Sequence, residues 1–192
     1  PYNSALDFGT GDFSIMGWIN NTGLNDTILD TRDQSGQSGI LVKVNSSGFI
    51  EVSTTAAGVS STAAGTLSTA GVNWTFFCVQ RSSNGTTQQV FVNGVIQTST
   101  SVIARSIAGT PGDPSFVGIN YALVGPLGSG SLSLLRISAT APSAAQIAKI
   151  YRDESLLFQD GAACTLYGTS DAVTALAHDD TTDLLHVGTS AG

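Results

Sequence analysis

The sequence has few charged side chains, and its cations do not gather anywhere. Charged residues make up 11% of the 192, and the 7 Lys and Arg residues are scattered from Arg32 to Arg152. Scattered cations leave no basic stripe that would neutralise nucleic-acid phosphates. The sequence also has no apolar run approaching the roughly 20 residues that span a bilayer. We therefore expect neither a nucleic-acid partner nor membrane insertion.

Cysteine is nearly absent as well. The two residues, Cys78 and Cys164, match neither a CxxC pair nor a zinc pattern. Because Cys78 lies in the apolar run 76–79, we interpret it as a small buried thiol, with a disulfide to Cys164 as the alternative. A folded chain of this length buries roughly 70% of the surface that its unfolded form exposes, so it needs no disulfide or structural metal.

Hydroxyl side chains are abundant instead. Ser and Thr make up about a quarter of the chain, whose net charge is −7, so hydroxyls rather than ions solvate its surface. This composition is common in strand-rich adhesive and virion proteins. The chain begins at Pro1 and its one methionine is Met16, so we expect a fragment or a processed product.

Turn residues interrupt the chain about every 8 to 12 residues, and the stretches between them alternate or run apolar, which predicts an all-β sandwich or barrel. Asn93-Gly94 between apolar residues supplies two positive-φ positions for a type I′ hairpin. The expected strands are residues 5–8, 13–19, 26–31, 40–45, 49–54, 74–81, 88–92, 95–98, 115–119 and 130–137, with a short strand around 66–67.

One helix is expected after the last of these strands. Ser143 lies three residues before Gln146, the spacing of a capping box. Apolar residues then recur at helical spacing, which predicts a helix over residues 144–152. We place a first domain at residues 1–158.

Residues 159–192 form a C-terminal hairpin extension in this prediction. Its strands are expected at 163–167, 172–178 and 184–189, with a turn at 179–183. Three short strands cannot bury an apolar face alone. The extension must therefore pack on the sandwich, on a partner subunit, or on parts of a longer chain.

Four stretches carry a family resemblance, in this order: ALDFGTGDFSIMGWI at 5–19; NWTFFCV at 73–79 with VFVNG at 90–94; FVG at 116–118 with LLRIS at 134–138; and SAAQIAKIY at 143–151. Together they resemble a laminin G-like domain of the concanavalin A-like lectin and glucanase superfamily, over about residues 4–158. The resemblance implies a jelly-roll sandwich of two curved antiparallel sheets. The family often has Gly-x-Ile-Asp-Glu before the Arg of its last strand, whereas GSLSL at 130–134 has no carboxylate, so the role of that Asp is absent or moved.

The aromatic residues alternate with polar ones and are expected to face a common core rather than to form a sugar platform. They are Trp18 and Trp74 with Phe8, Phe13, Phe76 and Phe91, packed with Ile137.

Catalytic groups are not evident in the sequence. Glucanases of the superfamily carry an acid and a nucleophile about 5 to 5.5 Å apart on one strand. Here Glu51 and Glu154 are far apart in sequence, and no Glu-x-Asp-x-x-Glu occurs. His178 and His186, with Asp179 beside them, fit solvated hairpin residues better than a metal or catalytic pair. We expect no enzymatic activity.

Calcium is the one cofactor that the resemblance implies, held at a rim of the sandwich by an Asp and backbone carbonyls. Asp26 and Asp113 are the chosen metal candidates, with Asp30 and Asp33 also considered. The alternative is that these are ordinary turn-capping aspartates and that no cofactor is bound.

The leading hypothesis is a carbohydrate-binding, non-catalytic recognition domain of a phage tail fibre or another virion appendage, extracellular otherwise. In this hypothesis, loops at one rim of the sandwich bind a cell-surface glycan, and a homotrimer combines several weak sites into a higher overall avidity. The candidate ligand-binding residues are Arg32, Asp33, Asn120 and Tyr121, with the tyrosine offered for stacking. The alternatives are a purely structural virion or oligomerisation domain, and a binding module of a bacterial secreted adhesin or polysaccharide-degrading enzyme.

Overall fold

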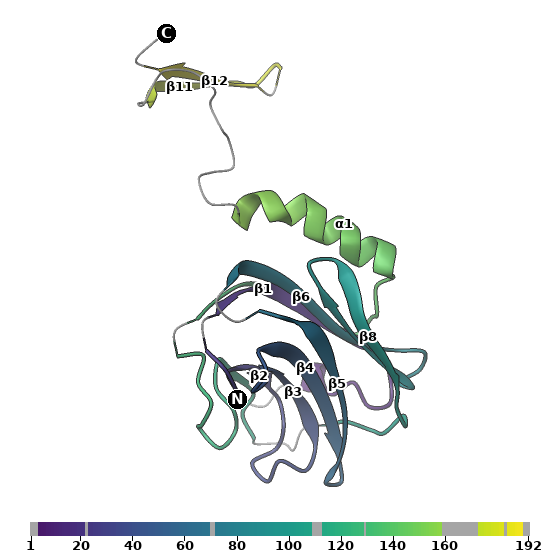
Figure 1. The fold of residues 1–192 in the computed structure, drawn as a ribbon. Helices are drawn as coiled ribbons and strands as arrows, with labels where there is room; N and C mark the ends of the chain where they lie inside the picture. The colour runs from purple at the N-terminus through teal and green to yellow at the C-terminus, as the bar shows by residue number, and fades with distance from the viewer. Residues whose placement is uncertain are drawn as a thin grey trace. The chain divides into compact units, whose positions relative to one another are not determined.

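The computed structural model describes residues 4–21, 23–69, 72–108, 113–128, 130–158, 173–182 and 184–189. The chain divides into two units, Pro1–Phe158 and Gln159–Gly192. The first unit is a sandwich of two antiparallel sheets with one helix, which confirms the expected all-β jelly roll (Figure 1).

Each sheet of the sandwich has five strands. One has the order β10-β1-β6-β7-β8 and the other the order β5-β4-β3-β2-β9. The strands are β1 (Phe13–Asn21), β2 (Thr27–Asp30), β3 (Gly39–Val44), β4 (Phe49–Ala56), β5 (Val59–Ser68), β6 (Val72–Ser82), β7 (Thr87–Val92), β8 (Val95–Ser101), β9 (Phe116–Val117) and β10 (Ser131–Ser138). The short helix η1 (Ser4–Leu6) precedes them, and α1 (Ala144–Ser155) and η2 (Leu156–Phe158) follow.

Two of the predicted strands are wrong or incomplete. Residues 5–8 begin in η1, where the Asp7 N–H donates to the Ser4 carbonyl (3.1 Å), and the Phe8 ring stacks on Phe13 with centroids 5.3 Å apart. In the segment 5–8, Phe8 therefore packs against the core, and the residues do not form a paired strand. The short strand expected around 66–67 is the end of β5, a ten-residue strand.

The local signals for the turn and the helix are confirmed. Asn93 and Gly94 both have positive φ, 50° and 76°, as a type I′ hairpin requires. The Ser143 side chain and Gln146 form the capping box. The helix then continues three residues past the expected end.

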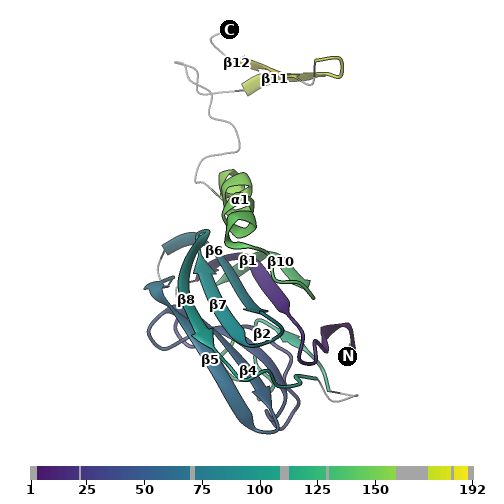
Figure 2. The same ribbon diagram turned by 90° about the vertical axis from the view of Figure 1, so that its right-hand side faces the viewer.

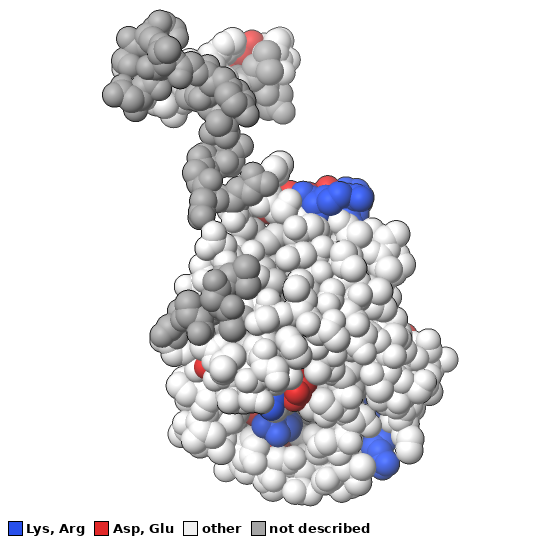
Figure 3. Space-filling model, in the orientation of Figure 1, with Lys and Arg blue, Asp and Glu red and all other residues white. Residues whose placement is uncertain are grey.

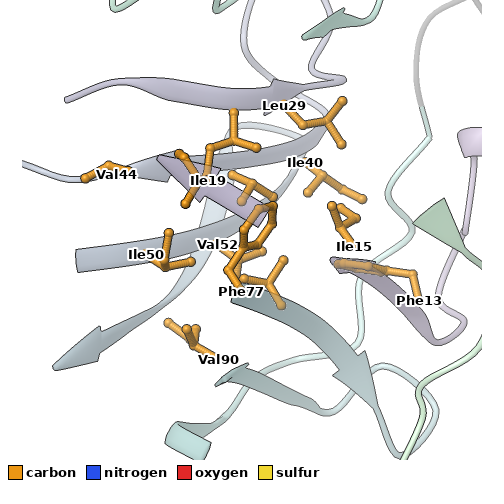
Figure 4. Close-up of a cluster of buried hydrophobic side chains, with 14 of the residues drawn as sticks. Phe13, Ile15, Ile19, Leu29, Ile40, Val44, Ile50, Val52, Phe77 and Val90 are labelled. Carbon is orange, nitrogen blue, oxygen red and sulfur yellow. The ribbon is translucent and has the colours of Figure 1, made fainter. Parts of the chain in front are cut away.

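The core between the sheets is formed mainly by apolar side chains. In Figure 4, Phe77 of β6 lies in the middle of the group, between Ile15 of β1 and Ile50 of β4. All three side chains have no exposed surface. This core joins the two sheets.

A second apolar cluster lies on the outer face of the sheet that contains β1, β6 and β8, under α1 (Figures 1 and 2). It contains Met16, Trp18, Phe76, Cys78, Phe91 and Ile147, with Trp74, Ile150, Tyr151 and Phe158 packed against it. The prediction of one common aromatic core is therefore wrong. Side chains alternate between the faces of a strand, so Phe13 and Trp18, five residues apart, point to opposite sides of β1.

One carboxylate fastens the helix to this sheet. The Trp18 indole N–H donates to Glu154 Oε2 (2.8 Å), and Arg136 Nη2 donates to the same oxygen (2.9 Å), while Arg136 Nη1 pairs with Oε1. The arginine of the last strand thus has its carboxylate partner on α1.

The second unit contains the expected hairpin, formed by β11 (Val173–Asp179) and β12 (Leu184–Thr189), which pair antiparallel. Its turn is held by Asp179, which accepts hydrogen bonds from the Thr181 N–H (2.9 Å) and the Thr182 hydroxyl (2.7 Å). The strand expected at 163–167 lies outside the described residues. Among those described, no helix is long and apolar enough to span a bilayer.

Candidate functional site

A buried carboxylate at the carboxyl end of β2 organises the candidate site. Asp30 has no exposed surface. Its Oδ1 accepts hydrogen bonds from Arg32 Nε (2.9 Å) and the Arg32 backbone N–H (3.0 Å), and its Oδ2 accepts from Arg32 Nη2 (2.8 Å). The Tyr121 backbone N–H also donates to Oδ2 (3.1 Å). Asp30 therefore joins two loops that lie far apart in the sequence.

The side chains of Arg32 and Tyr121 pack together next to the Asp30 carboxylate. The Arg32 guanidinium carbon lies 4.8 Å from the centre of the Tyr121 ring, a cation–π distance. Burial alone would lower the pKa of Arg32, but the hydrogen bonds and charge of Asp30 outweigh it and raise the pKa. Gly36 also lies against this ring, since a Cβ there would be 2.7 Å from the Tyr121 hydroxyl.

Asp33 shapes the neighbouring loop instead of facing solvent. The side chain is buried, and Oδ1 accepts hydrogen bonds from the Gln37 N–H (2.7 Å) and the Ser35 hydroxyl (2.8 Å). Burial acts to raise the pKa of Asp33, but these hydrogen bonds prevail and lower it. Asp33 is thus a turn-capping aspartate, while Gln34, Ser35 and Gln37 are exposed around it.

Asp113 and Asn120 likewise hold loops in place. Asp113 Oδ2 accepts a hydrogen bond from the Gln34 N–H (3.0 Å). Asn120 Oδ1 accepts from the N–H groups of Ala122 and Val124, each at 3.0 Å. We call Asp30, Arg32, Asp33, Asp113, Asn120 and Tyr121 the rim cluster. It contains all four predicted ligand-binding residues and one of the two predicted metal ligands.

The other predicted metal ligand lies elsewhere. Asp26 precedes β2, at the opposite end of the strand from Asp30, and its carbonyl accepts a hydrogen bond from the Val44 N–H (2.8 Å). The structure therefore does not bring Asp26 and Asp113 into one site. Within the described part of the chain, no three His, Cys, Asp or Glu side chains are placed to hold a metal ion.

The two glutamates are not arranged as a catalytic pair. Glu51, on β4, lies 3.3 Å from Lys43 Nζ and accepts a hydrogen bond from Asn45 Nδ2 (3.2 Å). Glu154 belongs to α1 and is bound by Trp18 and Arg136. Because α1 covers the outer face of the other sheet, the sandwich separates the two carboxylates.

The role of Asp30 was not predicted from the sequence, where this residue was considered only as a calcium ligand. The signal was present in the spacing Asp30-Thr31-Arg32. Residues two apart at the end of a strand point to the same side, which favours an ion pair there.

Charged groups are sparse on the visible face of the molecule. In Figure 3 most of that face is formed by uncharged residues, and the charged atoms gather in small patches, one of them over α1. Any ligand that met this face would therefore contact mainly uncharged residues.

Comparison with known proteins agrees with this fold. A protein-family model described as "Concanavalin A-like lectin/glucanases superfamily" matches residues 2–148. No curated protein sequence matches the chain.

Solved structures with the same fold include toxin binding domains. The receptor binding domain of botulinum neurotoxin type G is 15% identical with a TM-score of 0.58, over 75% of this chain and 38% of that one. Botulinum neurotoxin type C, described as dependent for cell entry on two ganglioside molecules, is 14% identical with a TM-score of 0.52, over 74% and 36%. The binding domain of Paraclostridial Mosquitocidal Protein 1 is 13% identical with a TM-score of 0.55, over 79% and 39%. The chain thus spans less than two fifths of their length.

Proposed function

The chain belongs to the concanavalin A-like lectin/glucanases superfamily, and on that premise we propose that it is a non-catalytic recognition domain that binds carbohydrate at the rim cluster. The observation that carries the proposal is the buried Asp30 carboxylate, which holds the Arg32 guanidinium and the Tyr121 backbone N–H, while the Tyr121 ring lies on the guanidinium before a ligand arrives. Fixed groups lose little conformational freedom on binding.

The groups around this pair suit a sugar. Gln34, Ser35 and Gln37 are exposed next to the fixed pair and offer amide and hydroxyl groups. Binding sites for small polar ligands combine an aromatic or apolar surface with a few placed hydrogen-bonding groups. Sugar hydroxyls, which both donate and accept, match such groups.

The fold neighbours support the same class of ligand. One of them is described as interacting with gangliosides, which carry carbohydrate, and others are described as receptor or binding domains. The separation of Glu51 from Glu154 supports the non-catalytic part of the proposal. Most glycoside hydrolases need two carboxyl groups that flank the scissile glycosidic bond.

The setting that we propose is a phage tail fibre or another virion appendage, assembled as a homotrimer. The high content of Ser and Thr with 11% charged residues supports a virion protein. Several weak sites in one oligomer would raise the overall avidity. A mass measurement in solution tests the trimer, and binding of the labelled chain to intact bacteria tests the attachment role.

A glycan array with the labelled full chain tests carbohydrate binding. We expect at least one oligosaccharide to bind, and Tyr121→Ala to weaken that binding at least tenfold because the ring is lost. Tyr121→Phe keeps the ring and serves as the matched control, with a smaller effect. Binding that persists unchanged in Tyr121→Ala would contradict the assignment of the site.

The second candidate function is a structural module that associates through its hairpin. Leu176 and Leu185 of the hairpin have 64% and 57% of their surface exposed within the described residues, and a two-stranded sheet is marginal alone. An array without any bound glycan, together with a stable trimer, would favour this alternative.

A further inference from the structure

We propose that the rim cluster selects uncharged glycans and disfavours forms of the same glycans that carry a sialic acid or another carboxylate. This inference rests on the proposed function and specifies the ligand class for the same site. It follows from the charges that the cluster holds and from the way in which its one cation is used.

The cluster has an excess of negative charge. It contains three carboxylates, Asp30, Asp33 and Asp113, and one guanidinium, that of Arg32. Hydrogen bonds to Asp33 favour its ionised form at neutral pH, as its lowered pKa indicates. The site therefore carries about two net negative charges in a chain whose overall charge is already −7. A second anion brought to this rim is repelled.

The charge of Arg32 is already compensated by Asp30. Proteins recognise carboxylates with the two-pronged edge of a guanidinium, and here Nε and Nη2 of Arg32 both donate to Asp30. A ligand carboxylate that used this same edge would have to displace Asp30, which has no exposed surface. Leaving that carboxylate buried without its counter-ion is strongly unfavourable.

The exposed groups next to the cluster are neutral. Gln34, Ser35 and Gln37 are uncharged and exposed, and they can bind hydroxyl or acetamido groups without any change of charge. The Asp113 carboxylate fixes the backbone of Gln34 (3.0 Å), so one negative charge lies beside these groups. Sugar hydroxyls can donate hydrogen bonds to such a carboxylate, whereas a sialic acid cannot approach it favourably.

The test uses pairs of oligosaccharides that differ by one terminal sialic acid, printed on one array and then titrated in solution. A ganglio-series tetrasaccharide and its monosialylated form make one such pair. We expect the neutral member of a bound pair to bind about tenfold more tightly at low salt, and this preference to shrink in 0.5 M NaCl, where the Debye length falls to about 4 Å.

A charge variant connects the preference to the rim. Asp113→Asn keeps an oxygen that can accept the Gln34 hydrogen bond and removes one charge, so we expect the preference to fall about threefold. Asp153→Asn is the matched control, because it removes one charge from an exposed ion pair on α1 and is expected to leave the preference unchanged.

The outcomes separate this inference from the function on which it rests. Neutral glycans that bind more tightly than their sialylated forms, with a smaller preference in Asp113→Asn, support it. Sialylated forms that bind as tightly or more tightly would overturn the ligand class and leave carbohydrate binding intact. An array with no bound glycan of either kind would overturn both.

Discussion

Asp30 shows how a single residue determines the geometry of the rim. Both of its carboxylate oxygens are used, and its partners come from its own loop and from Tyr121, 91 residues away. The charged partner, Arg32, keeps 17% of its side chain exposed, while Asp30 is fully buried. The Asp30 end of the ion pair is therefore shielded from solvent, and the Arg32 end is partly exposed.

Asp30→Asn is expected to destabilise the domain and to abolish glycan binding together. The amide cannot accept from all of the present donors and leaves the Arg32 charge without its partner, which costs about 3 kcal/mol for a buried pair. Urea unfolding followed by tryptophan fluorescence measures this loss. The control Asp153→Asn breaks an exposed pair and should cost less than about 0.5 kcal/mol. Equal stability of the two variants would contradict the role given to Asp30.

Cys78 provides a test of burial at the residue scale. It is a free thiol under α1, and burial raises its pKa to about 12, so the reactive thiolate is scarce at neutral pH. In a Cys164→Ser variant, iodoacetamide at pH 8 should leave the folded chain unmodified and label it fully in denaturing urea. Rapid labelling of the folded chain, seen by mass spectrometry, would show that the cluster under α1 is open.

At the scale of elements, most strands could be predicted because their signals are local. The Asn93-Gly94 turn and the Ser143 cap each depend on neighbouring residues, and strand alternation is read from the residues themselves. β5 was underestimated because its Ser, Thr and Ala residues lack an apolar pattern. It is supported by cross-strand hydroxyl contacts, such as Ser53 with Thr62 (2.7 Å). The division of the aromatic residues between two cores depends on α1 covering the outer face, which no local pattern indicates.

Glu154→Ala is expected to loosen α1 from the sheet. The Trp18 indole N–H loses its acceptor and Arg136 loses its partner, which we expect to lower the free energy of unfolding by about 1 to 2 kcal/mol. Asp153→Ala, one residue earlier and exposed, is the matched control and should cost little. Urea denaturation of both variants measures the difference. Identical midpoints would mean that Glu154 does not fasten the helix.

Gly36→Ala tests the contact between the two rim loops. Gly36 has a φ of +70°, and a Cβ there would lie 2.7 Å from the Tyr121 hydroxyl, so the ring must move. Gly118→Ala has a similar φ of +77° with its nearest neighbour at 3.9 Å, so it carries the backbone strain alone, about 1 kcal/mol. We expect Gly36→Ala to lose more stability than Gly118→Ala, and glycan binding to weaken at least fivefold in Gly36→Ala alone. Equal binding by the two variants would contradict the packing of Tyr121 on Gly36.

At the scale of the whole sandwich, the candidate site exists because of a long-range strand pairing. β9 pairs antiparallel with β2, with Asp30 opposite Phe116. This pairing brings the segment before β9 to the end of β2, and the loop after β9 returns to Asp30 through the Tyr121 N–H. The sequence indicated polar residues at the ends of both strands, and so the four ligand candidates. It could not indicate that the two strands are neighbours, because they are separated by more than 80 residues and by the six strands β3 to β8.

The covering of both inner faces and of one outer face limits where a ligand can bind the sandwich. The inner faces form one core, and α1 buries the second cluster on an outer face (Figure 2). Trp18 is 2% exposed, so the aromatic residues of that face are not a binding platform. The loops after β2 and β9 therefore present the best-organised polar surface among the described residues.

The most direct test of this account is an NMR titration of the ¹⁵N-labelled chain with a neutral glycan found on the array. We predict that the amide shift changes are confined to residues 30–38 and 113–124, the two loops of the rim cluster. Shift changes at α1 or along β7 and β8, with the rim loops unaffected, would contradict the assignment of the site.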